Sequence, residues 1–600
     1  MATTASQPDT DASRITVSIN GGTILGKRQA SSDKYPKPVD VFYAIPYATT
    51  LRFKPPTPCV PVESGSVLDA RHEGKHAPQP MALFETEEGI LRVNVFRSAR
   101  DEGAPEEEGE EGKEEREEGK EERGRDGDSS RGCAGVSSRR RLPVMVYFHG
   151  GAYNFGDPLE RDLVSLVSWA GEAEVDMDMV VVSVGYRLGA LGFPHEVMEE
   201  EGGSLNLGLR DQRMGVEWVR RWIGEFGGEG GDVTMMGVSA GGHSIGHHLL
   251  HPRRLPFTKA ILESASPTAR CVLSASHPRV KAQHESFIRA LRSQIAPHIP
   301  VSSAPLNAIL KAWTSVWAEH EKTTTWPFQP LIDGDVIPAG PLSSLEALPA
   351  ASASSPAVSI LTGFCTHEGT HFVPTTASTN AEFLRFFKTL IPGLSDPDLR
   401  ALEELYPDPV THPNSPYRNR GNTGTVPQDE QGGGGGGGGI AIGIGAQFRR
   451  LYTAFGHWAY ICPILHIAHV LSSKGHTVYL YEYAPISSPF GACSHGDQAH
   501  VVAHEMDHLC GYKGLGKTAR EMTLRWSRFI GSPTGDLGDL WPQYGEGEGQ
   551  QRLLVFGEGN DEGAGGKGEG RPVRMRVVSE EERRVCEFWW RIMGLSQGDV

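Results

Sequence analysis

The clearest chemical signature in the chain is the run Gly237-Val238-Ser239-Ala240-Gly241. It fits the pattern G-x-S-x-G, in which a serine on a sharp turn between a strand and a helix presents its hydroxyl group as a nucleophile. Small neighbours let the chain turn that tightly because glycine carries no Cβ atom. The apolar run at 233–236 predicts the strand, and residues 243–250 can form the helix. We therefore expect a nucleophilic Ser239 whose reaction develops negative charge near a helix N-terminus.

A second glycine-rich segment, His149-Gly150-Gly151-Ala152, follows its own apolar run about 90 residues upstream. It is similar to the oxyanion loop of lipases and esterases. When a serine attacks a carbonyl group, the carbonyl oxygen becomes an anion that preorganised N–H donors stabilise. We expect this oxyanion hole to consist of the backbone amides of Gly151, Ala152 and Ala240.

The elements around these two segments follow an α/β pattern. Continuous apolar runs at 144–148 and 180–184 predict strands that are buried on both faces, which is typical of a parallel sheet covered by helices. Within 208–226, apolar residues recur every four positions and predict an amphipathic helix. The fold class is therefore predicted to be α/β, with a mostly parallel central sheet flanked by helices.

Most of the chain resembles the type-B carboxylesterase and lipase family, the group that includes the cholinesterases. The segments that carry the resemblance are 42–48, 51–53, 149–152, 206–213, 226–228, 233–234, 237–242, 260–264 and 331–335, followed by Trp526 and Phe529. The resemblance implies an α/β-hydrolase fold and a serine hydrolase that cleaves carboxylic esters through an acyl-enzyme intermediate, with no cofactor.

The resemblance also implies the two partners of Ser239. The family's catalytic acid is a glutamate followed by glycine, and Glu368-Gly369 matches this pattern. Glu368 would then orient the imidazole and stabilise the imidazolium. The family's histidine lies in a His-Gly motif after a strand, which His495 matches. His500 is the alternative candidate for the catalytic histidine, because apolar residues follow it in the sequence. The chain order Ser239, Glu368, His495 is the order expected of α/β-hydrolases.

Two departures from the family concern the substrate site. Val238 stands beside the nucleophile where the family usually has glutamate, so a choline-like cationic substrate is less expected. Ala152 stands where a third glycine is usual in the oxyanion loop. Its backbone amide is retained, but the added methyl group should narrow the acyl pocket.

The acidic balance of the chain is concentrated in one segment. The net charge is −17, and residues 101–128 hold fifteen acidic against five basic residues. No basic face for nucleic acid is evident. The low-complexity segment 101–141 is predicted to be a disordered insertion, as are 421–439 and 545–571. Family-like segments flank each insertion, so we expect a disordered N-terminus at 1–13 and one catalytic domain at 14–600.

The expected location rests on features that the sequence lacks. The polar start has no apolar core of signal-peptide length, and no run of about 18 apolar residues predicts a membrane span. The family's early disulfide cysteine has no counterpart at 87–95, and none of the eight cysteines forms a C-x-x-C pair. We therefore expect a cytoplasmic protein.

Several alternatives stay open. A non-catalytic binding protein is possible because some relatives of cholinesterases are adhesion proteins without the serine, although a complete triad argues against this. The same machinery could cleave lactones, carbamates or amides, and the natural ester and oligomeric state are not predicted. The spacing of His500, His504 and His508 could suit metal ligands on a helix, but no Glu-bearing zinc-protease pattern accompanies them, and no metal site is expected.

Overall fold

The structure of the protein is a computed structural model, which describes residues 14–100, 141–195, 203–253, 255, 257–270, 272–418, 443–488, 491–545 and 549–597. The N-terminus at 1–13 and the insertions at 101–141 and 421–439 were predicted to be disordered. They lie outside the described residues, apart from Arg141.

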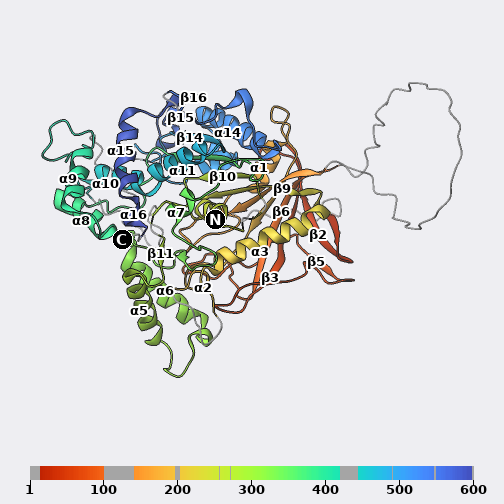
Figure 1. The fold of residues 1–600 in the computed structure, drawn as a ribbon. Helices are drawn as coiled ribbons and strands as arrows, with labels where there is room; N and C mark the ends of the chain where they lie inside the picture. The colour runs from red at the N-terminus through yellow and green to blue at the C-terminus, as the bar shows by residue number, and fades with distance from the viewer. Residues whose placement is uncertain are drawn as a thin grey trace.

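Strands and helices alternate along most of the chain (Figure 1). The strands are β1 (Arg14–Ile19), β2 (Gly22–Gln29), β3 (Val39–Thr49), β4 (Thr57–Pro58), β5 (Val67–Asp69), β6 (Ile90–Ser98), β7 (Leu142–Phe148), β8 (Val180–Val184), β9 (Gly228–Val238), β10 (Lys259–Glu263), β11 (Leu273–Ser274), β12 (Leu331–Ile332), β13 (Ser359–Cys365), β14 (Thr477–Tyr483), β15 (Arg552–Asn560) and β16 (Glu569–Val577). The α-helices are α1 (Leu163–Ala170), α2 (Gly189–Gly192), α3 (Leu207–Trp222), α4 (Ala240–Leu250), α5 (Pro278–Arg292), α6 (Leu306–His320), α7 (Pro341–Glu346), α8 (Asn380–Leu390), α9 (Asp396–Leu405), α10 (Phe448–Gly456), α11 (Cys462–Ser473), α12 (Gln498–Val502), α13 (Met506–Leu509), α14 (Lys513–Gly531), α15 (Glu580–Arg591) and α16 (Met593–Ser596).

A large mixed sheet forms the centre of the protein. Its strand order is β1-β2-β3-β6-β8-β7-β9-β10-β13-β14-β15-β16, with β4 beside β3 and β5 beside β2. Neighbouring strands from β8 to β15 run parallel. The carboxyl ends of parallel strands meet at one edge of a sheet, which is where open α/β sheets place their ligands. Ser239 directly follows β9 at this edge, and the glycine-rich loop that begins at His149 directly follows β7.

Side chains of the central strands alternate between two apolar layers. Val144, Val146 and Phe148 of β7 pack in one layer with helices α3, α4 and α11. Met145 and Tyr147 of the same strand pack in the other layer with α1, α12 and α14. Because both faces are covered, the central strands are apolar at most positions, as the sequence indicated. The predicted α/β class is confirmed.

The prediction of a disordered insertion at 545–571 is wrong for residues 549–571, which the structure describes. Strands β15 and β16 pair antiparallel from Arg552↔Val577 to Asn560↔Glu569, and β15 also runs parallel to β14. The many glycines of this segment resemble a low-complexity composition, which is why the sequence pattern suggested disorder. Gly557 has a φ of 69° and lies against Pro485, so in this strand glycine supplies a backbone conformation that other residues rarely adopt.

One continuous helical stretch, Phe448–Ser473, is long and apolar enough by composition to cross a membrane. It comprises α10, a π-helical turn at His457–Ile461 and α11. Inside the protein, 78% of its most apolar window is buried. This is the burial of a core helix, which agrees with the packing of α11 in the apolar layer shared with α3 and α4.

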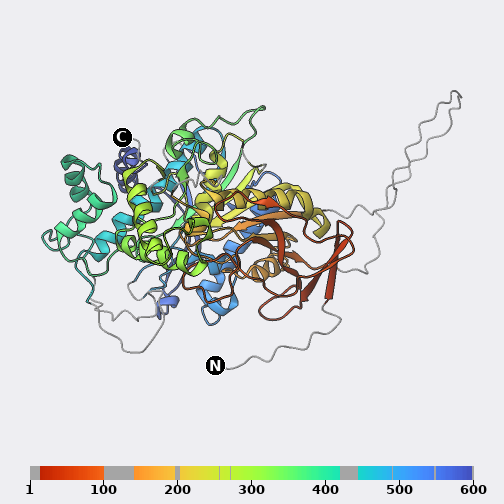
Figure 2. The ribbon, with the colours of Figure 1, turned by 90° about the horizontal axis from the view of Figure 1, so that it is seen from below.

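Helices α5 and α6 lie outside the sheet and are drawn in green (Figures 1 and 2). They pack on each other. The segment from the end of α6 to β12 returns toward the sheet and brings aromatic side chains to the edge at which Ser239 lies.

Candidate active site

Ser239 occupies a strained turn between β9 and α4. Its φ and ψ are 53° and −121°, a conformation that is rare for a residue other than glycine. Its amide donates to the carbonyl oxygen of Glu263 at 2.9 Å, and its carbonyl oxygen accepts from the amide of His243 at 2.8 Å. These two hydrogen bonds hold the turn between the end of β10 and the first turn of α4.

The glycines of the elbow are needed because backbones approach closely there. A Cβ atom on Gly241 would lie 2.0 Å from the carbonyl oxygen of Phe148. Any larger residue would push the start of α4 away from the end of β7. The elbow and the oxyanion loop are therefore held next to each other, although each of them was predicted from its own motif.

Glu368 and His495 form a direct pair. Nδ1 of His495 lies 2.5 Å from Oε2 of Glu368, which is completely buried. The other carboxylate oxygen accepts from the amide of Cys365 at 2.7 Å. Because an ionised carboxylate only accepts, the proton of the imidazole belongs on Nδ1, and Nε2 is left as the acceptor.

His495 and Ser239 meet at one cavity. Nε2 of His495 is buried and has no hydrogen-bond partner among the described residues, and both His495 and Ser239 line the cavity. His500 lines it too, but its Nδ1 contacts Oε2 of Glu505 at 2.8 Å. The structure thus brings His495, not His500, to Glu368.

The oxyanion loop has its own anchors. The amide of Gly150 donates to Oε1 of Glu160 at 2.9 Å, and the Tyr186 hydroxyl donates to the carbonyl oxygen of His149 at 2.8 Å. The His149 ring stacks on Tyr186 with centroids 4.3 Å apart, and burial lowers the pKa of His149. A neutral imidazole in this position leaves the loop uncharged beside the reacting carbonyl.

The three predicted oxyanion donors remain available. Gly151 and Ala152 have positive φ values of 100° and 54° and line the cavity beside Ser239. Within the described part of the chain, neither amide donates a hydrogen bond to another protein group. Ala240 is the first residue of α4, where backbone N–H groups have no partner inside the helix.

A wall of aromatic side chains, which the sequence analysis missed, encloses the remaining space. The cavity has a volume of about 490 Å³. Ring contacts run in succession from Phe155 through Trp317, Trp326 and Phe372 to His495, with centroid distances of 4.8, 5.5, 5.4 and 5.2 Å. These rings come from four separate segments, so no local pattern announces them. They make the cavity suited to an apolar group.

A buried ion pair supports the floor of the site. Arg161 lines the cavity, and its NH2 atom lies 2.5 Å from Oε2 of Glu263. Trp526 donates to the other oxygen of Glu263 at 3.1 Å. Burial acts to lower the pKa of Arg161, but the charge and hydrogen bond of Glu263, together with the nearby Tyr147 and Glu160, outweigh it and leave that pKa raised. The pair holds the end of β10, to which the amide of Ser239 is bonded.

Comparison with known proteins identifies the family and the fold of the chain. The model of the carboxylesterase family matches residues 13–396. Secreted lipase 4 of Gibberella zeae is 28% identical over 481 residues, which cover 76% of this chain and 76% of that protein. Secreted lipase 5 of the same organism is 41% identical over 123 residues, or 20% of this chain and 22% of that one. The crystal structure of Aspergillus niger EstA superposes with a TM-score of 0.69 at 19% identity and covers 98% of this chain and 100% of that one. The predicted fold is confirmed.

The expectation of a cytoplasmic protein is wrong. Both of these Gibberella relatives are named secreted lipases, which points to an extracellular protein. The expectation rested on an absent leader pattern and an absent cysteine. Neither absence identifies the compartment of the protein, because the same helices and strands can form the folded domain inside or outside the cell.

Proposed function

Because the chain belongs to the carboxylesterase family and is a carboxylic ester hydrolase, we propose that it works through an acyl-enzyme formed on Ser239. Ser239, His495 and Glu368 are the proposed triad. The pairing of His495 Nδ1 with Glu368, at a cavity that His495 and Ser239 both line, is the observation that carries the proposal. A catalytic triad and an oxyanion hole are typical of the family.

In the first half of the reaction, Nε2 of His495 takes the hydroxyl proton of Ser239 while the oxygen attacks the ester carbonyl. The new oxyanion accepts hydrogen bonds from the amides of Gly151, Ala152 and Ala240. Loss of one such donor typically costs about 10²–10³-fold in kcat.

In the second half, the imidazolium of His495 gives its proton to the leaving alkoxide, and the C–O bond of the ester breaks. A water molecule then enters and loses a proton to His495 as it attacks the acyl-enzyme. Glu368 stabilises the imidazolium at both stages by accepting its Nδ1–H. The proton that His495 holds finally returns to Ser239 as the acid leaves.

The aromatic wall supports an ester with an apolar acyl or alcohol group. Val238 stands where the family usually has glutamate, so that carboxylate is missing beside the nucleophile. Two other carboxylates, those of Glu160 and Glu321, line the cavity. We therefore expect the shape and apolar walls of the cavity to select the substrate more strongly than the substrate's charge does. Lactones, carbamates and amides fit the same chemistry, and the leaving group is decided by the shape of the pocket.

We also propose that residues 14–600 act as one catalytic domain. The first strand, β1, and the last, β16, lie in the same sheet as the strands that precede Ser239 and Glu368. Strands from β1 to β15 contribute buried side chains to the apolar layers on the two faces of this sheet.

The proposal is tested with p-nitrophenyl esters and a fluorophosphonate probe, which labels an activated serine covalently. The wild-type protein should hydrolyse the esters and become labelled, and Ser239→Ala should do neither. Ser293→Ala, which removes an exposed serine, is the matched control and should behave like the wild type. Labelling that persists in Ser239→Ala would refute the assignment of the nucleophile. A folded wild-type protein that is neither labelled nor active would instead indicate a non-catalytic binding protein.

A further inference from the structure

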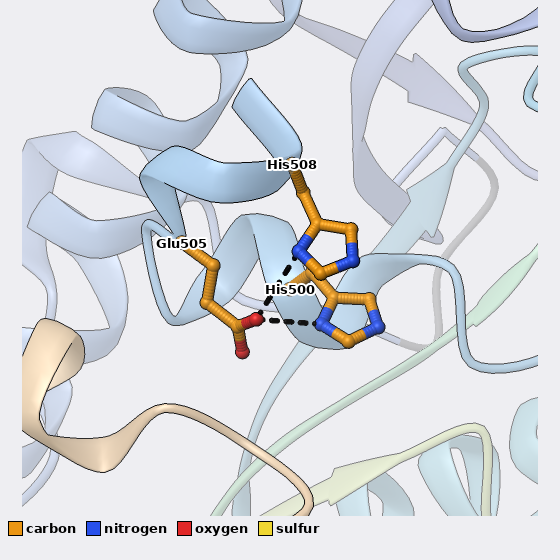
Figure 3. A group of neighbouring side chains, drawn as sticks. All are labelled: His500, Glu505 and His508. Atoms are coloured by element: carbon orange, nitrogen blue, oxygen red, sulfur yellow. Dashed lines mark hydrogen bonds and ion pairs between the residues drawn. The ribbon is translucent and has the colours of Figure 1, made fainter. Parts of the chain in front are cut away.

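Three side chains at the rim of the catalytic cavity converge on a common point (Figure 3). His500 lies on α12, His508 lies on α13, and Glu505 lies in the link between these helices. Oε2 of Glu505 is 2.8 Å from Nδ1 of His500 and 3.3 Å from Nδ1 of His508. The carboxylate thus faces both rings, as the two dashed lines in Figure 3 show.

The arrangement differs from what the histidine spacing suggested. A single helix would have placed His500, His504 and His508 on one face, but α12 ends at Val502 and His504 has a φ of 55°. His504 is buried, and its ring stacks on Trp169 with centroids 3.8 Å apart. The break in the helix removes His504 from the group and puts Glu505 in its place.

We propose that His500, Glu505 and His508 bind a divalent transition-metal cation, with zinc as the best match. Two imidazole nitrogens and a carboxylate oxygen, with water in the fourth position, form a ligand set that zinc accepts. Zinc bonds of about 2.0–2.1 Å place tetrahedral ligand atoms about 3.3 Å apart. Nδ1 of His508 already lies at that distance from Oε2 of Glu505, and Nδ1 of His500, at 2.8 Å, must move slightly farther from it.

The carboxylate is held in place before any cation arrives. The other oxygen of Glu505, Oε1, accepts from the amide of Asp162 at 3.0 Å, and the residue is only 7% exposed. A backbone bond of this kind orients a ligating carboxylate and leaves one oxygen for the metal. Glu505 is therefore the fixed ligand of the three.

The histidines supply the adaptable ligands. Their rings stack with centroids 3.9 Å apart and an angle of 12° between the planes, so the two Nδ1 lone pairs lie in separate, nearly parallel planes. Binding one cation requires one ring to turn about its Cβ–Cγ bond. The side chains of His500 and His508 are 41% and 53% exposed, which leaves room for that rotation and for water on the cation.

The site is tested by isothermal titration of the full chain with zinc chloride after treatment with a chelator. We expect one equivalent of zinc to bind, and His508→Gln to weaken binding at least tenfold. His508 is chosen because it lies outside the catalytic cavity. Glu505→Gln, which retains an oxygen for the amide of Asp162, should weaken binding by a similar factor. Excess magnesium should not compete, because magnesium prefers oxygen ligands in octahedral geometry.

His298→Gln is the matched control, since it removes an exposed histidine elsewhere on the surface and should bind zinc like the wild type. Thermal unfolding without metal checks that each variant is folded. Absence of zinc binding by the wild-type protein would overturn the proposal. So would binding of equal strength in His508→Gln, Glu505→Gln and the wild type, because the zinc would then be held elsewhere.

Discussion

Nδ1 of His495 lies 2.5 Å from Oε2 of Glu368, although 127 residues separate them in the chain. The contact sets the tautomer of the imidazole and leaves Nε2 as an acceptor without a protein partner among the described residues, on a histidine that lines the same cavity as Ser239. It also distinguishes His495 from His500, whose carboxylate partner is Glu505. The proposed chemistry depends on this pair more than on any other contact.

Replacing Glu368 by glutamine should lower kcat for p-nitrophenyl butyrate by about 10³–10⁴-fold, because the amide no longer stabilises the imidazolium or its tautomer. Steady-state kinetics measure the effect. Glu285→Gln changes an exposed glutamate in the same way and should leave kcat unchanged. A loss smaller than tenfold in Glu368→Gln would show that another group orients His495.

Replacing Gly241 by alanine should inactivate the enzyme without unfolding it. The added Cβ atom would meet the Phe148 carbonyl oxygen at 2.0 Å, so the elbow and the oxyanion loop must separate. We expect kcat to fall at least about 10²-fold, the cost of a misplaced oxyanion donor. Gly516→Ala, in α14 with open space around it, is the control and should retain activity. Normal turnover in Gly241→Ala would contradict the proposed geometry.

Replacing Trp317 by alanine should widen the cavity on the side of the aromatic wall. The ratio of kcat/KM for long-chain to short-chain p-nitrophenyl esters should rise about tenfold, since a hydrophobic pocket discriminates by about 10–200-fold per methylene. A series from acetate to octanoate measures this ratio. Trp222→Ala removes a half-buried tryptophan outside the cavity and should leave the ratio unaltered. An unchanged ratio in Trp317→Ala would place the acyl chain elsewhere.

Replacing Glu263 by glutamine should destabilise the fold by about 3–5 kcal/mol, because the buried charge of Arg161 loses its partner. The two side chains are 0% and 1% exposed, so water cannot compensate. Urea unfolding measures the loss. The double variant Arg161→Met/Glu263→Leu should lose less than Glu263→Gln, since no unpaired charge remains. Glu174→Gln breaks an exposed ion pair with Arg520 and should change stability little.

The stability of the protein should fall as the pH drops below about 6.5, and His195 should contribute to that fall. Burial lowers the pKa of His195 from 6.5 to about 3, and its Nε2 accepts from the amide of Phe328 at 3.1 Å. The unfolded chain therefore binds a proton that the folded chain excludes, and each such proton costs about 1.4 kcal/mol per pH unit between these two pKa values.

His195→Gln keeps an acceptor for the Phe328 amide but cannot titrate. Its free energy of unfolding should decline less steeply with falling pH than that of the wild type, by about 1.4 kcal/mol per pH unit well below pH 6.5. Unfolding in urea at a series of pH values measures the slope. His298→Gln, at an exposed position, serves as the control. Equal slopes in His195→Gln and the wild type would mean that His195 is protonated in the folded protein.

Much of the fold could be predicted from local sequence. Continuous apolar runs at 144–148 and 180–184 indicated strands buried on both faces, and they are β7 and β8 in the parallel part of the sheet. Such runs are informative because burial on both sides of the sheet leaves few positions for a polar residue. The segment 545–571 shows where local sequence is a poor guide to the fold. Its glycines look like low complexity in sequence, but in β15 and β16 they meet backbone requirements set by neighbouring strands.

What the sequence determined by itself was the chemistry that is local along the chain. The elbow at Ser239 and the glycine loop before Ala152 are short motifs whose turns depend on adjacent residues, so they can be recognised without coordinates. The tertiary structure alone decided which histidine meets Glu368, which aromatic rings enclose the cavity, and that Glu505 rather than His504 joins His500. These contacts join residues that are distant in the chain or depend on where a helix breaks, and only the packing of the whole sheet and its helices settles them.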